Sequence, residues 1–449
     1  MSTVVVLSTG VAAVVLLPVA WRIRQRGFDP FEPIVVFALA WGVMFVVRPV
    51  AIVVRDDVIF YGVDIGGTLD KAVLLGLLGA VAFVVAYERP LGARIARRLP
   101  SPPEQVDPRA ALGWSIGVAA IGVSALLLLL VTAGGVGAIG TFLGGRGEEL
   151  DELLATSPMY LWWASLLVIP AALVAVALAV TDRRPGTAVV AAALLGVALV
   201  RTVPVGNRVF LLVLGGGIVV FLYLRVRSRP GIAVLVVAPL LALFVSKAVL
   251  DLRYAENRRN VTTIVERFVA SPTRAFRPIL EGPDAEMAPA LAGALSVVPE
   301  QLPHRYGAVT LGDLARRPIP RQLWAGKPDP PGQEVVALVW PVARETGGFD
   351  PAFTPLLYFY WDFGLLGVLG GLAAFGLVAR SAYAYFRQYE GNLGVQIAFA
   401  AALWFLVVAV RQDPVSVVVE ATVVLVPIAV IFRLASPRKH GRVAEVPIA

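Results

Sequence analysis

Residues 1–26 read MSTVVVLSTGVAAVVLLPVAWRIRQR, and this stretch decides the fold class. A long apolar run comes first, and three arginines follow it. A cleavable signal instead has a short apolar run with its positive charges in front. A run of about 20 apolar residues can cross the hydrocarbon layer of a membrane, roughly 30 Å thick, as one helix. We therefore expect a first transmembrane helix with its N-terminus outside.

The rest of the chain has the same character. Of its 449 residues, 58% are hydrophobic and only 16% are charged, and the mean hydropathy is +0.79. A soluble domain is typically about half apolar, with about a quarter of its residues charged. In lipid, backbone polar groups must be satisfied within the spanning element, which favours helices. The composition therefore predicts an all-α polytopic membrane protein.

The apolar runs predict about eleven transmembrane helices. They cover residues 2–21, 33–54, 70–87, 111–133, 160–180, 187–203, 208–224, 231–249, 356–379, 394–411 and 415–434. Helices 1–8 then occupy residues 1–249, and helices 9–11 occupy 356–435. Between them, residues 250–355 form a large, partly helical extracytoplasmic loop. A cytoplasmic tail covers 436–449.

The distribution of charge supports this count. With the N-terminus outside, every proposed inner segment is basic, from RIRQR at 22–26 to the tail. The outer loops at 55–71 and 144–152 are acidic. Cytoplasmic loops collect lysine and arginine, so an odd number of spans with the C-terminus inside is expected. The loop 250–355 then lies outside. It contains a weakly apolar stretch, MAPALAGALSVVP at 287–299, that is expected either to lie on the membrane surface or to pack under the loop.

Composition also excludes several kinds of site. The chain has no cysteine, so disulfides and thiol chemistry are excluded. Its two histidines, His304 and His440, argue against a histidine-rich metal site, and we expect neither a metal nor a cofactor. The net charge of +8 is explained by the basic inner loops, so we do not expect nucleic-acid binding.

Basic residues in the outer segments are informative because membrane orientation does not explain them. The planar fork of arginine matches a phosphate group, so these residues are candidates for binding a phosphorylated substrate. The candidates are Arg208, Arg253, Arg258, Arg305, Arg321, Lys327 and Arg411. Three alternatives stay open: Arg201 and Arg208 could reach lipid phosphates, charges in 251–260 could pair locally, and Arg411 could pair with Asp413.

The segment FTPLLYFYWDFGLLGVLGG, residues 353–371, leads from the large loop into the next helix. Tyr358, Tyr360 and Trp361 are typical of an aromatic belt at the membrane interface. Asp362 follows at or inside the apolar boundary, where an acidic side chain is costly and is usually paired or functional. Glu420 likewise falls within the last predicted span. The outer arginines would suit a lipid-linked diphosphate as ligand. In the loop, Trp324 and Trp340 are then expected to stack on the sugar attached to that diphosphate.

Two segments resemble the O-antigen polymerase (Wzy-like) family of oligosaccharide repeat-unit polymerases. They are YGAVTLGDLARRPIPRQLWAGKP at 306–328 and YFYWDFGLLGVLGGL at 358–372. That family commonly has an IPR-x-LW…KP segment in its large external loop and an aromatic, acid and glycine entry to the next helix. The GNR turn at 206–208 and Arg411 also resemble it, so the resemblance spans roughly residues 200–413.

This resemblance implies a fold like that of the C-type glycosyltransferases and a location in the bacterial cytoplasmic membrane. It implies that donor and acceptor are polyprenyl-diphosphate-linked glycans, that membrane lipid surrounds the site, and that a flippase and a chain-length regulator are partners. Neither a metal nor a cofactor is implied. Arginines would then hold the diphosphate, and Tyr358 would also contact substrate. The candidate general bases are Glu256, Asp362 and Asp413, and the sequence does not choose among them.

Other functions predict other patterns. An O-antigen ligase typically has a histidine in its loop motif, for which His304 is a weak match. A lipid or glycan transporter would have polar residues in several spans and internal pseudo-symmetry, and the sequence has neither feature. A structural membrane protein would leave the outer arginines without a role.

Overall fold

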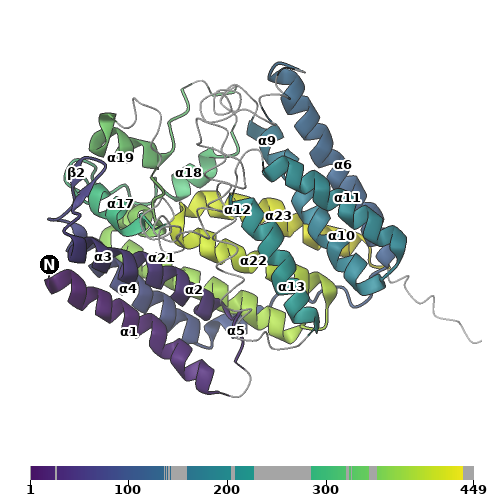
Figure 1. The fold of residues 1–449 in the computed structure, drawn as a ribbon, viewed down its shortest axis with the longest axis horizontal. Helices are drawn as coiled ribbons and strands as arrows, with labels where there is room; N and C mark the ends of the chain where they lie inside the picture. Colours follow the sequence, from purple (N-terminus) through teal and green to yellow (C-terminus); the bar gives the residue numbers. More distant parts are fainter. Residues whose placement is uncertain are drawn as a thin grey trace, which may run out of the picture.

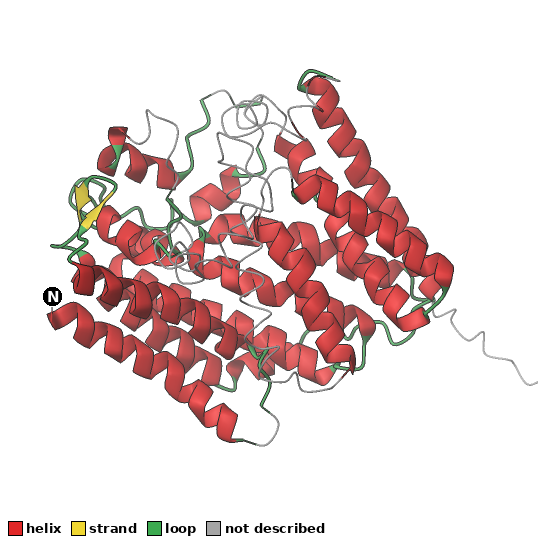
Figure 2. Ribbon diagram, in the orientation of Figure 1, coloured by secondary structure: helices red, strands yellow, loops and turns green. Residues whose placement is uncertain are grey.

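The structure is a computed structural model. It describes residues 2–25, 28–135, 137, 139, 142, 159–203, 208–226, 285–319, 323–324, 326–342 and 351–437. Nine helices in these ranges are long and apolar enough to cross a membrane. The chain is therefore a mostly helical, multi-pass membrane protein (Figures 1 and 2).

These nine spans coincide with nine of the predicted ones. They are formed by α1 (Ser2–Arg24), α2 with α3 (Pro33–Gly42 and Arg48–Arg55), α4 (Leu69–Glu88), α6 (Pro108–Thr132), α9 with α10 (Met159–Ser165 and Val168–Asp182), α11 (Pro185–Thr202), α21 (Pro355–Gln388), α22 (Leu393–Arg411) and α23 (Pro414–Leu434). The predicted span 208–224 corresponds to α12 (Arg208–Leu211) and α13 (Gly217–Val226), which are joined by a π-helical turn. The predicted span 231–249 lies outside the described residues, so the total of eleven remains a prediction.

Proline and short polar residues set the starts of several spans. Helices α6, α21 and α23 each have proline in the first turn, where the missing N–H has no helical partner to lose. Asp107 caps α6 and Asp413 caps α23, each by accepting a hydrogen bond from a backbone N–H of the first turn. Local sequence therefore fixes these boundaries.

Helices α4 and α21 pack along each other, with α1 against α4 (Figure 1). Small residues allow this close approach. A Cβ atom at Gly376 would collide with the backbone of Phe83, and one at Gly79 would lie 2.9 Å from Leu356. Helices α6, α10 and α11 form a second group, and α22 lies between the two groups, beside α2 and α13.

The spans have two distinct ends. At one end, which we call the loop end, lie the hairpin of β1 (Ile59–Phe60) and β2 (Val63–Asp64) and the helices α17 (Met287–Ala294), α18 (Leu311–Arg316) and α19 (Pro331–Val339). At the other, the tail end, Tyr383 binds Asp29, and Arg22 pairs with both Glu32 and Glu88. The loop end contains the segments predicted to be outside.

Helix α17 contains the weakly apolar stretch MAPALAGA, for which the sequence allowed either a position on the membrane surface or packing under the loop. All eight residues are buried, mainly against α4. Thr68 at the start of α4 donates to the Ala292 carbonyl at 2.7 Å. Nearby, burial beside Glu286 raises the pKa of Tyr61 to about 12, so this hydroxyl stays a donor at neutral pH. The stretch therefore forms the base on which the loop elements pack.

The predicted orientation can be tested by labelling single cysteines, because the native chain has none. Gln301 is exposed at the loop end and Ser101 is exposed at the tail end. In intact cells, a membrane-impermeant maleimide should label a Gln301→Cys variant. A Ser101→Cys variant should be labelled only after permeabilisation. The reverse pattern would show that the loop end faces the cytoplasm.

Candidate functional site

The candidate site is built around a break in α21. Phe363 and Gly364 have non-helical backbone angles, and Gly364 has φ +59° and ψ −141°, a combination that favours glycine. The break ends the first part of the helix at Asp362, whose side chain is fully buried. An acid at this depth needs several hydrogen-bond donors.

Those donors come from the loop after α17. Asp362 Oδ1 accepts from the backbone N–H groups of Gly307 and Val309, both at 2.9 Å. Oδ2 accepts from the N–H of Thr310 at 2.9 Å and from its hydroxyl at 2.6 Å. Both carboxylate oxygens are therefore occupied, which favours an anchoring role for Asp362 over the role of general base.

Arg305, a predicted phosphate ligand, is already in a pair. Its two terminal nitrogens bind the two oxygens of Glu334 at 3.0 and 2.6 Å, and the guanidinium lies 4.8 Å from the centre of the Trp361 ring. Glu334 belongs to α19 and Trp361 to α21, so Arg305 connects these two helices to the loop. The pair is about one-third exposed, so its net contribution to stability is small.

A second cluster joins the loop to the turn between α22 and α23. Arg317 Nε lies 2.9 Å from Asp313, and its Nη2 lies 3.4 Å from Asp413 Oδ1. The same Oδ1 caps α23 by accepting from the Ser416 N–H at 2.7 Å. Asp413, a predicted base, is therefore a helix cap held by Arg317. Arg411, the last residue of α22, lies two residues before it.

Lys327, another predicted ligand, binds the backbone just after α18. Its ammonium donates to the carbonyl oxygens of Ile319 at 2.8 Å and Arg317 at 3.4 Å. Lys327 is therefore held beside the end of α18. Because Arg317 also contacts Asp413, the basic motif of the loop lies next to the turn that carries Arg411.

Glu420 is a buried acid that the sequence analysis noted but did not include among the site residues. It is buried, about two turns into α23, and its Oε1 accepts from Gln412 Nε2 at 2.9 Å. Within the described part of the chain, Oε2 has no hydrogen-bond partner. In the sequence, this residue could have been selected because it is an acid within an apolar span.

The sequence left open whether Arg201 reaches lipid phosphates. In the structure it does not reach the lipid surface. The side chain is fully buried, with its guanidinium 3.7 Å from the centre of the Trp162 ring. Nε donates to the Ser165 hydroxyl at 2.6 Å, and Nη2 donates to the Trp162 carbonyl at 3.3 Å. Arg201 therefore joins α11 to α9 and cannot pair with a lipid phosphate in this arrangement.

The aromatic residues also differ from expectation. Trp340 is 2% exposed and donates to the Phe60 carbonyl at 3.3 Å, so it cannot stack on a sugar in this arrangement, whereas Trp324 is partly exposed. Tyr358 is 7% exposed and Trp361 is fully buried, so both pack in the core instead of forming an interface belt. The substrate-binding role proposed for Tyr358 is therefore less favoured than packing.

The remaining predicted residues lie beyond the part of the chain that the structure describes. Arg253, Glu256, Arg258 and Arg321 lie outside the described residues, as does the side chain of Arg208. In the part of the chain that the structure describes, no group of three or more histidine, aspartate or glutamate residues is arranged to hold a metal ion.

An apolar cavity opens between α21, α22 and α23. Its volume is about 410 Å³, and aliphatic and aromatic side chains line it. At the loop end it reaches Pro355, Ala409 and Pro414, directly beside Asp413, and it extends to Ala382 and Leu425 toward the tail end. The charged cluster of Arg317 and Asp413 thus lies at the mouth of a hydrophobic groove.

No protein-family model matches the chain, and comparisons with curated proteins and with solved structures also gave no match. The resemblance to O-antigen polymerases therefore rests on the motifs at 206–208, 306–328 and 358–372 and on Arg411. Of these motifs, residues 307–310 bind Asp362, and Arg317 contacts Asp413, two residues after Arg411.

If Asp362 anchors the loop, Asp362→Asn should destabilise the protein. The amide loses the charge and places its NH₂ group against N–H donors, which should cost about 2 kcal/mol or more. Thermal unfolding in detergent would measure this loss, and Glu300→Gln, an exposed acid of the same loop, is the control. Equal unfolding temperatures for the two variants would contradict the anchoring role.

Proposed function

We propose that the protein is a glycan polymerase that joins polyprenyl-diphosphate-linked repeat units at the outer face of the bacterial cytoplasmic membrane. The observation that supports this proposal most is the direct contact between the two motifs that resemble the polymerase family. Asp362 of the second motif binds the backbone of the first, and Arg317 of the first contacts Asp413 beside Arg411. Motifs that act on one substrate need this proximity.

The apolar groove supports a lipid-linked substrate. Its volume of about 410 Å³ is within the usual range for ligand pockets, roughly 300–1,000 Å³. Its mouth lies beside the charged cluster, so a prenyl chain in the groove would place its diphosphate near Arg317 and Arg411. Arginine suits this role because it forms paired, charge-assisted hydrogen bonds with phosphate oxygens.

The proposed reaction is one displacement. A hydroxyl of the acceptor's terminal sugar attacks the anomeric carbon of the donor's reducing-end sugar. The bond from that carbon to the diphosphate oxygen breaks, and polyprenyl diphosphate leaves with the bonding electrons. The arginines stabilise the charge that develops on the leaving group.

The hydroxyl proton must pass to a base. Both oxygens of Asp362 are occupied, and Asp413 caps a helix, whereas Glu420 Oε2 is free of hydrogen bonds within the described residues. That oxygen is buried within the span, so none of these three acids is placed to take a proton from an acceptor hydroxyl in this arrangement. Glu256 remains a candidate from the sequence.

A ligase is the second enzyme to consider, and its loop histidine would have to act on the acceptor. His304 Nδ1 lies 3.2 Å from the Trp361 carbonyl oxygen, and its ring contacts Tyr360 edge-on at 5.6 Å. These contacts indicate a packing role for His304. The geometry therefore favours polymerase over ligase, and a transporter is supported by no described contact.

The decisive experiment separates glycans by size in a strain lacking the gene. Such a strain should make single repeat units, and the wild-type gene should restore long chains. Arg321→Ala and Arg411→Ala should each lower polymerisation by about 100-fold, because each removes a charge-stabilising group. Arg387→Ala, which breaks an exposed pair with Glu390 at the tail end, should retain activity.

Two outcomes would contradict the proposal. Long chains that remain on the lipid carrier would indicate a ligase. Unchanged glycans would show that this chain does not act in their synthesis. Membrane insertion of each variant, measured by immunoblot of washed membranes, distinguishes lost catalysis from lost protein.

The groove makes a separate prediction about the lipid carrier. Ala374 lines the cavity, so Ala374→Trp should fill it and raise the KM for a long-chain donor about tenfold, with a smaller effect on a short-chain analogue. Leu366→Trp, at a position 79% exposed outside the cavity lining, is the matched control. Kinetics on purified protein would test this, and equal effects on both donors would exclude the groove as the tail site.

A further inference from the structure

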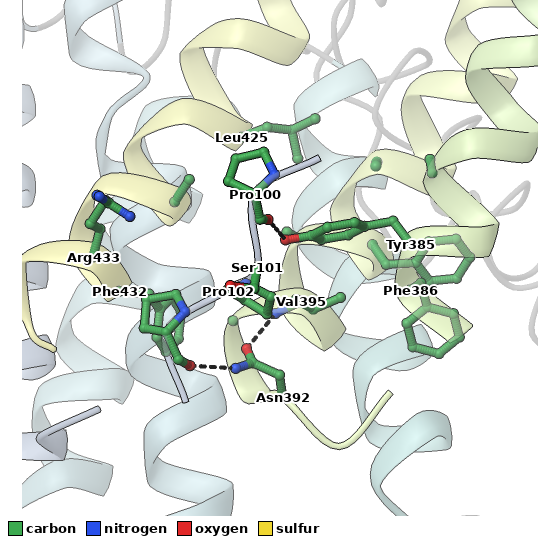
Figure 3. Close-up of a pocket in the computed structure, with 17 residues that line it drawn as sticks. Pro100, Ser101, Pro102, Tyr385, Phe386, Asn392, Val395, Leu425, Phe432 and Arg433 are labelled. Carbon is green, nitrogen blue, oxygen red and sulfur yellow. Dashed lines mark hydrogen bonds between the residues drawn. The ribbon is translucent and has the colours of Figure 1, made fainter. Parts of the chain in front are cut away.

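A second cavity lies at the tail end, away from the proposed polymerase site (Figure 3). Its volume is about 380 Å³, and it lies among α21, α22, α23 and the segment Pro100–Pro103, which we call the proline strap. The strap is held in place by two hydrogen bonds. The Tyr385 hydroxyl donates to the Pro100 carbonyl at 2.9 Å, and Asn392 Nδ2 donates to the Pro103 carbonyl at 2.7 Å.

The walls of this cavity are apolar. Phe386, Phe399 and Phe432 contribute rings, and Leu425 and Ala429 contribute aliphatic surface. Leu425 lies eight residues before Arg433 in α23, which is roughly 12 Å along a helix. One leaflet of the hydrocarbon core is about 15 Å thick, so the cavity has the depth for much of one acyl chain.

A polar hollow adjoins the cavity at the proline strap. Its volume is about 720 Å³, and it shares Ser101, Pro102, Pro103 and Arg433 with the apolar cavity. Glu104, Gln105 and Ser436 complete its lining. An apolar cavity that faces the bundle interior thus opens into a polar hollow at the membrane boundary, as a lipid chain and its headgroup require.

The charges of this hollow are not used by the fold. Arg433 is exposed at the end of α23, and within the described residues its guanidinium forms no ion pair and no hydrogen bond. Glu104 is exposed, and its carboxylate likewise has no partner there. The two lie in one hollow without an ion pair between them, so a positive and a negative group are both available to a ligand.

We propose that this pocket binds a zwitterionic glycerophospholipid whose headgroup has a phosphate and a primary ammonium, such as phosphatidylethanolamine. Arg433 binds the phosphate, Glu104 binds the ammonium, and one acyl chain occupies the aromatic cavity. Basic pockets between transmembrane helices bind lipid headgroups, and arginine is suited to phosphate. Glu104 would repel a headgroup with net negative charge, which favours the zwitterion.

The alternative is that Arg433 only orients the chain, as basic residues near a cytoplasmic boundary commonly do. An orienting arginine would not distinguish between lipids with the same phosphate. A built headgroup site would do so, because the carboxylate selects for an ammonium that can donate hydrogen bonds. Lipid selectivity therefore separates the two roles. The inference is independent of the reaction proposed above.

The test measures which lipids stay bound to the purified full-length protein. The protein is reconstituted in phosphatidylcholine nanodiscs that contain equal minor fractions of phosphatidylethanolamine and phosphatidylglycerol, and retained lipids are counted by native mass spectrometry. The wild type should retain phosphatidylethanolamine. Arg433→Gln should lower this retention about tenfold, as expected for one charge-assisted contact. Arg387→Gln, an exposed tail-end arginine paired with Glu390, should not lower it.

The Glu104→Gln variant tests selectivity. It should lower retention of phosphatidylethanolamine and raise that of phosphatidylglycerol, because the repulsive carboxylate is gone. Ala429→Trp should displace the acyl chain and abolish retention of both lipids, with folding checked by thermal unfolding. Equal retention by wild type and Arg433→Gln would overturn the proposal, as would a wild-type preference for phosphatidylglycerol or phosphatidylcholine.

Discussion

The buried carboxylate of Asp362 is the constraint on which the loop end depends. It terminates the first part of α21 and receives three backbone N–H groups and one hydroxyl from residues 307–310. An ionised group in an apolar boundary is stable only when its hydrogen bonds are satisfied, so the loop and the broken helix must form together. The contacts of Arg305 with Glu334 and of Arg317 with Asp413 then secure the same loop to α19 and α23.

The membrane helices were predictable because apolar length is a local property of the chain. Nine predicted spans coincide with described helices of suitable length and hydropathy, and a tenth coincides with a shorter apolar helix. The buried loop helix at 287–294 was recognised only as a weakly apolar stretch. Its burial depends on contacts with α4, more than 200 residues earlier, which periodicity cannot show.

The individual roles of charged residues were harder to predict, because charge alone does not identify the partner. Sequence marked Arg305 as a phosphate ligand and left open whether Arg201 reaches lipid phosphates. The structure pairs the first with Glu334 and buries the second against Trp162. Asp362 was predicted as a candidate base at the apolar boundary, and its hydrogen-bond donors lie about fifty residues earlier, at 307–310. Glu420, noted only as an acid within a span, has one buried oxygen without a hydrogen bond in the described part of the chain.

The two cavities are not isolated from each other. Both are lined by Ala382, Phe399, Ala402 and Leu425, so the groove from the loop end and the pocket from the tail end meet near the middle of the bundle. If the groove holds a prenyl carrier and the pocket an acyl chain, as proposed above, carrier length and acyl-chain length become competing variables in one protein.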